Sequence, residues 1–191
     1  MSSMYDTRDF RKGLKVLINN DPWVIVDFQH VNPGKGAAFT RTKVKNLRTG
    51  QVVENNIKSG DKLEKPDVED KNMQFLYADG EGYHFMDTQN FEQISLSNQE
   101  IGDTKYYLIE NSIIKVLFFK SKPIGIETDT FVELKVKETA PGVRGDTATG
   151  GSKPAIMETG LTITVPFHIN EGDVLRVDTR EGVYVDRVSR K

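Results

Sequence analysis

The chain has 191 residues, a formal net charge of −2 and no cysteine, and its three histidines, His30, His84 and His168, are far apart in the sequence. This composition excludes a disulfide framework and thiolate metal sites, and it argues against a histidine metal cluster. No basic start leads into an apolar run, and no window reaches the roughly 18 apolar residues that a membrane span needs. We therefore expect a soluble, cytoplasmic protein with no membrane partner, no metal and no other cofactor.

The small net charge hides an uneven distribution. Residues 1–64 carry 11 Lys/Arg against 7 Asp/Glu, residues 65–128 carry 6 against 11, and residues 129–191 carry 9 against 10. Clustered positive charge favours a polyanionic partner. We expect the N-terminal third to approach phosphate and the acidic middle to be held away from it or to face something else, with chance fluctuation as the alternative.

Residues 31–39 form a proline- and glycine-containing break between two apolar, β-branched runs. Proline fixes φ at the second position of a β-turn and glycine accepts a positive φ at the third, so Asn32–Lys35 is predicted to be a type II turn. The flanking runs, Val24–Phe28 and Phe39–Val44, predict a hairpin with Lys35 at its tip. An ordinary exposed turn is the alternative.

Three basic residues, Arg41, Lys43 and Lys45, recur at every second position after this turn. Side chains alternate across a strand, so these three are predicted to share one face, with Val44 on the other. Clustered Lys and Arg supply the sequence-independent part of nucleic-acid affinity. The pattern indicates a phosphate-binding stripe or, alternatively, a solvated barrel face.

The rest of the chain also consists of short apolar runs separated by Gly- and Pro-rich turns. Two polar or proline-broken stretches, Ser59–Asp67 and Lys122–Thr130, are predicted to be junctions. The prediction is an all-β protein of three small β-barrels in series, with domains at residues 1–65, 66–128 and 129–191. Strands are expected at Phe10–Ile18, Trp23–Val26, Gln51–Ile57, Ser112–Phe119, Phe131–Lys137, Asp173–Thr179 and Gly182–Val188. Met73, Phe75, Tyr83, Phe85 and Phe118 are expected in a core, with base stacking as the alternative.

No catalytic constellation is apparent. The glycines of Gly145–Lys153 invite a nucleotide-binding interpretation, but a phosphate-binding loop needs lysine directly after its second glycine, whereas Gly151 and Ser152 intervene here. No carboxylate is paired with a histidine or serine in a nucleophile context. We expect a protein that is not an enzyme.

The run Lys153–Gly172 closely resembles the signature of bacterial translation elongation factor P, with its lysine, alanine, two glycines, Val-Pro and spaced aliphatic residues in register. Asn32–Gly36, Gly145–Thr147 and Val177–Arg180 extend the resemblance over essentially the whole chain. It implies an SH3-like (KOW-type) N-terminal barrel followed by two OB-fold barrels, in an elongated L shape that mimics transfer RNA.

The resemblance also implies a monomeric factor that binds the 70S ribosome between the P and E sites and relieves stalling at consecutive prolines by stimulating peptide-bond formation. The loop Asn32, Pro33, Gly34, Lys35 and Gly36 would contact peptidyl-tRNA, and Lys35 would be extended by a lysine-modifying enzyme, often by β-lysylation. Arg41, Lys43 and Lys45 would contact phosphates of tRNA or ribosomal RNA, and Gly145, Asp146 and Thr147 would approach the small subunit and the E-site codon. The alternatives are a paralogous branch with the same fold and a general single-stranded RNA-binding OB protein.

Overall fold

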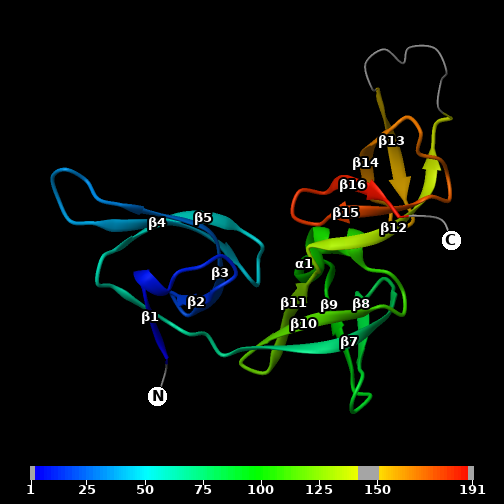
Figure 1. Cartoon of the computed structure of the whole chain (residues 1–191). Helices are drawn as coiled ribbons and strands as arrows, with labels where there is room; N and C mark the ends of the chain where they lie inside the picture. Colours follow the sequence, from blue (N-terminus) through cyan, green and yellow to red (C-terminus); the bar gives the residue numbers. More distant parts are fainter. Residues whose placement is uncertain (1–2, 142–150, 189–191) are drawn as a thin grey trace. The chain divides into compact units, whose positions relative to one another are not determined.

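The structure is a computed structural model that describes residues 3–141 and 151–188 (Figure 1). These residues form 16 β-strands in three antiparallel sheets of six, five and five strands, together with one short α-helix, α1 (Asn98–Ile101). The all-β prediction is therefore confirmed. Within the described residues no helix is long and apolar enough to cross a membrane.

The first sheet has the strand order β1-β6-β2-β3-β4-β5. Its strands are β1 (Met4–Asp6), β2 (Lys15–Ile18), β3 (Asp21–Val31), β4 (Phe39–Asn46), β5 (Val52–Lys58) and β6 (Lys62–Glu64), with a 3₁₀ turn at Thr7–Asp9. Asn19 and Asn20, with φ of 51° and 62°, make the two-residue turn between β2 and β3, a conformation that asparagine tolerates better than most residues. The buried side chains of Phe10, Leu14, Val16, Ile25 and Val44 form the core of this sheet.

The second sheet has the order β11-β10-β7-β8-β9. It contains β7 (Val68–Ala78), β8 (Tyr83–Asp87), β9 (Gln93–Leu96), β10 (Ile113–Phe119) and β11 (Lys122–Glu127), with α1 and a 3₁₀ segment at Gly102–Tyr107 between β9 and β10. Met73, Phe75, Phe85 and Phe118 are at most 9% exposed, which confirms the core prediction for these four side chains and removes them as base-stacking candidates.

Two stretches that we predicted to be junctions are partly strands. β6 lies inside Ser59–Asp67, where it pairs with β1 along Asp6–Met4, and β11 occupies most of Lys122–Thr130. Proline removes a hydrogen-bond donor, but β11 is the terminal strand of its sheet, where Pro123 is tolerated. The predicted junctions thus overlap strands, because proline and charge mark sheet edges as well as linkers.

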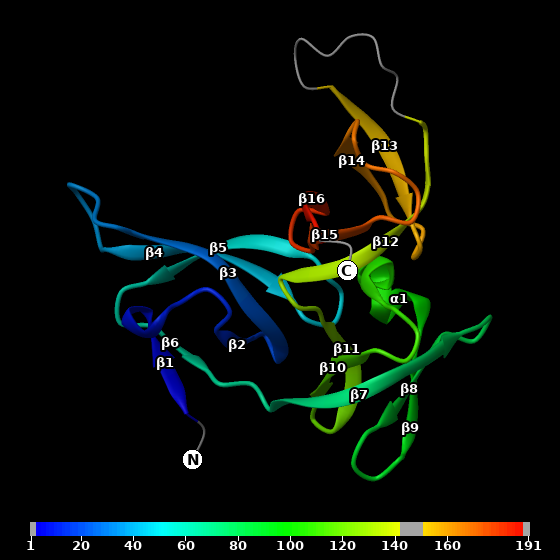
Figure 2. The same cartoon turned by 45° about the vertical axis from the view of Figure 1, so that its right-hand side comes forward.

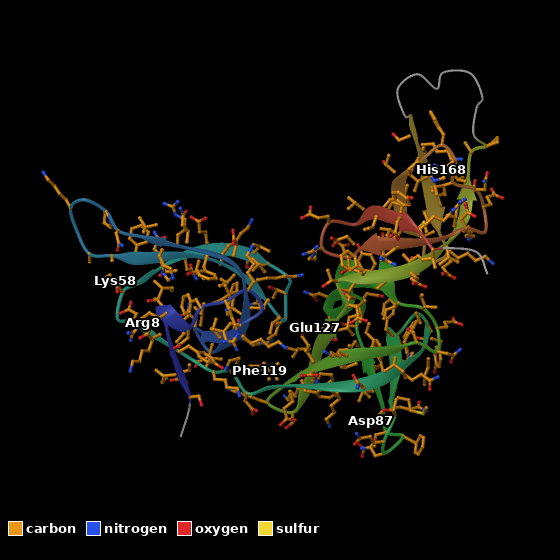
Figure 3. The ribbon with its side chains drawn as sticks, viewed as in Figure 1. Arg8, Lys58, Asp87, Phe119, Glu127 and His168 are labelled. Carbon is orange, nitrogen blue, oxygen red and sulfur yellow. The ribbon has the colours of Figure 1, made fainter. Side chains whose placement is uncertain are left out.

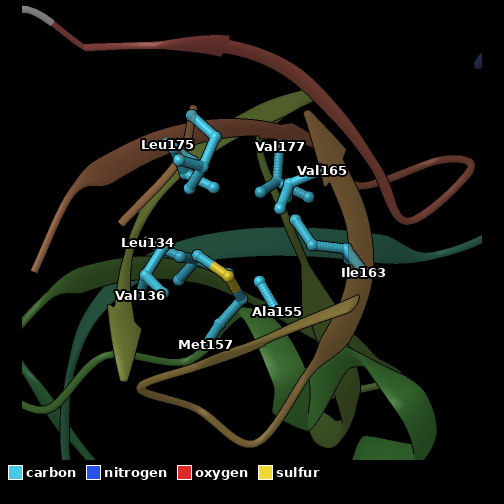
Figure 4. Close-up of a cluster of buried hydrophobic side chains, with 9 residues drawn as sticks. Leu134, Val136, Ala155, Met157, Ile163, Val165, Leu175 and Val177 are labelled. Atoms are coloured by element: carbon cyan, nitrogen blue, oxygen red, sulfur yellow. The ribbon is translucent and has the colours of Figure 1, made fainter. Parts of the chain in front are cut away.

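The third sheet has the order β14-β13-β12-β15-β16. Its strands are β12 (Phe131–Thr139), β13 (Ser152–Met157), β14 (Thr162–Pro166), β15 (Val174–Asp178) and β16 (Val183–Arg187). The predicted strands at Phe131–Lys137, Asp173–Thr179 and Gly182–Val188 are thus confirmed to within a few residues. Figure 4 shows the core, in which aliphatic side chains and Met157 converge from β12, β13, β14 and β15.

The chain divides into two compact units, one of Met1–Gly102 with Ile113–Ile126 and one of Asp103–Ser112 with Glu127–Lys191. In the first unit, Leu117, Phe119 and Ile124 of the second sheet pack with Leu17 of β2 and with Leu47, which directly follows β4. Figure 3 labels Phe119. This apolar cluster joins the first and second sheets within one compact unit. The domain boundaries predicted near residues 65 and 128 stay predictions.

The second unit includes a segment, residues 103–112, that precedes β10 in the sequence. Tyr107 and Ile109 pack against the core of the third sheet, and the Thr159 hydroxyl donates a hydrogen bond of 2.6 Å to the carbonyl of Tyr106. Burial, together with the charges of Asp103 and Asp178, raises the pKa of the Tyr107 phenol. The segment is therefore an integral part of this unit.

Candidate functional site

The connection between β3 and β4 is an exposed loop. Val31 pairs with Phe39, so residues 32–38 form the loop, and Asn32 to Ala37 are all exposed, Lys35 among them. The β3–β4 hairpin extends beyond the other strands of the first sheet in both views (Figures 1 and 2). Lys35 thus lies on an exposed loop at the end of the β3–β4 hairpin.

The type II turn predicted at Asn32–Lys35 is wrong. Such a turn needs a positive φ near +80° at Gly34, but the positive φ of the loop, +106°, lies at Gly36. A loop that closes between residues 31 and 39 spreads the chain reversal over more residues than a four-residue turn, so the reversal does not fall on the Pro-Gly pair. Gly36, on the C-terminal side of the lysine, is the glycine whose conformation disfavours other residues.

Hydrogen bonds hold the hairpin directly below the loop. His30 and Thr40 are paired residues, with 2.8 Å between His30 Nδ1 and Thr40 Oγ1, and the Thr40 side chain is buried. The His30 ring also meets Phe28 edge-on, with 5.6 Å between ring centroids. The base of the loop is therefore fixed by side chains as well as by the backbone ladder.

The predicted basic face exists. Arg41, Lys43 and Lys45 are exposed on β4, and the residues that alternate with them are buried. The shared face is confirmed, whereas its contact with phosphate stays a prediction.

Sequence reasoning missed two carboxylates on this face. Lys43 lies opposite Asp27 on β3 and opposite Glu54 on β5, and Arg41 Nε is 3.5 Å from Glu54 Oε1. Lys12, 3.2 Å from Asp27, lowers the pKa of that carboxyl through its hydrogen bond and its charge, and Lys43 adds a smaller effect. The middle of the stripe is thus partly neutralised.

Lys45 has a different setting, because its paired residues are Val24 and Val52. No acidic residue is therefore directly across from it on either neighbouring strand. These acidic and basic residues are all visible in the sequence, but only the strand register shows which of them lie opposite one another.

The remaining candidate residues lie elsewhere. Gly145, Asp146 and Thr147 lie outside the described residues. Lys153, the lysine after the glycine-rich stretch, is 6% exposed and donates to the carbonyl of Ala140, so it is a structural residue. Within residues 3–141 and 151–188, no three His, Asp or Glu side chains are grouped to hold a metal ion.

Comparisons with known families agree with this arrangement. The chain matches "Elongation factor P (EF-P) KOW-like domain" over residues 6–63, "Elongation factor P (EF-P) OB domain" over residues 68–126 and "Elongation factor P, C-terminal" over residues 132–187. The three matches follow one another along the chain and together span most of it.

Individual relatives extend this result. An elongation factor P from Bdellovibrio bacteriovorus is 56% identical over 98% of this chain and 100% of its own length, and one from Thermodesulfovibrio yellowstonii is 50% identical over 97% and 99%. A solved structure, "Eukaryotic translation initiation factor 5A from Methanococcus jannaschii", is similar in fold, with a TM-score of 0.54 and 22% identity over 66% of this chain and 92% of that one. The prediction of a translation factor rather than an enzyme is confirmed, and the chain belongs to the elongation factor P family.

Proposed function

We propose that this translation factor acts in the cytoplasm, binds the 70S ribosome between the P and E sites, and stimulates peptide-bond formation when the ribosome stalls at consecutive prolines. The observation that carries the proposal is the exposed Lys35 on a loop whose base is held by the His30–Thr40 contact. In this proposal Lys35, bare or extended by a lysine-modifying enzyme, positions the end of peptidyl-tRNA, and Asn32, Pro33, Gly34 and Gly36 shape the approach.

The physical argument concerns orientation. Proline is a sterically constrained donor and acceptor, so a stalled step lacks productive geometry, and fixing the reactants lowers the barrier without any chemistry by the factor. A cation on a held loop adds an electrostatic contact to the tRNA end without reorganisation at the moment of reaction. The ribosome supplies the reaction, and the factor supplies position.

The exposed face of β4 is proposed to hold phosphates of tRNA or ribosomal RNA. Phosphate contacts position a protein without reading sequence. Arg41 and Lys43 share their face with Glu54 and Asp27, so Lys45 is proposed to contribute most. The segment Gly145–Thr147 is proposed, from the family resemblance, to contact the small subunit near the E-site codon.

The test is a translation assay on a reporter with a run of prolines. Lys35→Ala is expected to lose most of the stimulation, because it removes the amine and any group attached to it. Lys137→Ala removes an exposed lysine from β12 and is expected to behave as wild type. Full stimulation by Lys35→Ala would refute the positioning role.

Modification is tested by intact mass. Protein purified from its native host is expected to be heavier than the sequence mass, with the increment localised by peptide mapping to Lys35. A native mass equal to the sequence mass would refute modification and leave bare Lys35 as the proposed contact.

A further inference from the structure

The loop between β8 and β9 holds a bulky aromatic residue, Phe91, in a left-handed backbone conformation with φ of 60°. The loop closes as a hairpin, because the Phe91 amide donates to the Asp87 carbonyl at 3.0 Å and the Asp87 amide donates to the Glu92 carbonyl at 2.8 Å. A positive φ is unusual for any residue except glycine and is a clear outlier for a bulky one. Glycine or asparagine would satisfy this position with less strain.

Packing does not explain the phenylalanine. Phe91 is 68% exposed, the highest value among the exposed large hydrophobic side chains of the described residues. An apolar ring in water contributes little to folding, since the hydrophobic gain comes from area removed from water. The residue therefore has a strained backbone conformation, and most of its surface remains in water.

The loop keeps its shape through other groups. Asp87 Oδ1 accepts hydrogen bonds from the amides of Gln89 at 2.7 Å and Asn90 at 3.4 Å, and Asn90 Oδ1 accepts one from the Glu92 amide at 3.0 Å. Figure 3 labels Asp87 at the start of this loop. These hydrogen bonds hold the backbone of the loop without using the Phe91 side chain.

Backbone strain that persists at an exposed residue, where folding gains little from it, indicates a role in binding another molecule. The charge around the ring identifies the partner. Glu92, which is exposed, directly follows the ring, and residues 65–128 carry 6 lysines, no arginine and 11 Asp/Glu, so a nucleic acid would be repelled. Aromatic side chains that enter apolar pockets are typical anchors of protein interfaces, and complementary charge at the rim guides the approach.

We propose that Phe91 is an anchor that inserts into an apolar pocket with a basic rim on a protein component of the ribosome. The choice of the ribosome rests on the proposed function; the anchor and the chemistry of its pocket rest on the loop alone.

The first experiment measures stability and binding on the same variants of the full chain. Phe91→Gly is expected to raise the melting temperature, because strain is relieved, and to weaken co-sedimentation with 70S ribosomes about tenfold or more. Gln89→Ala, which leaves the ring and the hydrogen-bonded loop in place, is expected to change neither. Unchanged ribosome binding of Phe91→Gly would overturn the anchor, as would a fall in melting temperature of the size expected for loss of a core residue.

The second experiment identifies what the ring touches. The photoreactive residue p-benzoylphenylalanine at position 91 is expected to form, on 70S ribosomes, an adduct that survives ribonuclease and is degraded by protease. An adduct lost to ribonuclease would overturn the protein partner in favour of RNA, and the absence of any adduct would overturn the anchor. If wild-type protein does not sediment with ribosomes, the proposed function is refuted. If wild-type protein sediments and Phe91→Gly sediments equally well, only the anchor role of Phe91 is refuted.

Discussion

Gly82, the residue before β8, has no room for a side chain. Its φ is +143°, and an added Cβ would lie 2.3 Å from the carbonyl oxygen of Leu96 and 3.2 Å from its carbonyl carbon. The blocking atoms are backbone, and Leu96 is paired with Tyr83, so relief requires separating β8 from β9 at this end. Gly82→Ala is therefore expected to strain or break the pairing.

The size of the effect follows from two contributions. A residue forced into a sparsely populated region of φ and ψ costs about 1–3 kcal/mol. Displacing the strand to relieve the clash adds to this, so we expect a loss of about 3 kcal/mol or more in the free energy of unfolding, within the range of severe single substitutions. Gly80→Ala is the matched control, because in the same turn an added Cβ meets no atom within 4 Å and φ lies outside the positive range. We expect Gly80→Ala to be within about 0.5 kcal/mol of wild type.

Urea unfolding followed by tryptophan fluorescence measures both variants. The single tryptophan, Trp23, lies in the same compact unit as Gly82, so its signal reports the affected part of the chain. A loss below about 1 kcal/mol for Gly82→Ala, or equal losses for the two variants, would refute the steric argument.

Three further predictions concern charged side chains. Lys153→Met keeps the aliphatic stem but leaves the Ala140 carbonyl without its donor, so unfolding followed by circular dichroism is expected to show a loss of about 1–3 kcal/mol. The Arg8 guanidinium lowers the pKa of Asp6 from 3.8 to about 2, chiefly through its side-chain hydrogen bond. The ionised Asp6 carboxylate therefore stabilises the fold above about pH 4, and this stabilisation is lost as pH falls toward 2. Asp6→Asn is expected to be less stable than wild type at pH 7, and the difference in stability is expected to disappear between about pH 4 and pH 2. Lys45→Ala is expected to weaken ribosome binding and to reduce the slope of log affinity against log salt by about one, and an unchanged slope would remove Lys45 from the phosphate contacts.

Local sequence chemistry predicted much of the scaffold and of the site. The alternation around Arg41, Lys43 and Lys45 was sufficient to predict an exposed face, because side-chain period in a strand is a local property. Which charges oppose Lys43 depends on the register of β3 and β5, to which Asp27 and Glu54 belong, and no local pattern specifies it.

Other features needed the fold. The Pro-Gly pair predicted a turn at Gly34, but loop length decided that the positive φ falls at Gly36. The sequence shows Phe91 only as an aromatic residue near two strands. Its positive φ and its high exposure depend on the geometry of the β8–β9 hairpin, which the sequence pattern does not specify. The segment around Tyr107 was likewise hidden, since it packs against a core made from residues much later in the chain.

That segment has a consequence for synthesis of the protein. Residues 103–112 are synthesised before any strand of the third sheet, so Tyr107 and Ile109 lack their apolar partners until that sheet has been made. The hydrogen bond from Thr159 to Tyr106 forms only after β13 has emerged. The second unit therefore closes around a piece of chain made in advance, and a nascent chain arrested inside the third sheet leaves that piece exposed to proteases and chaperones.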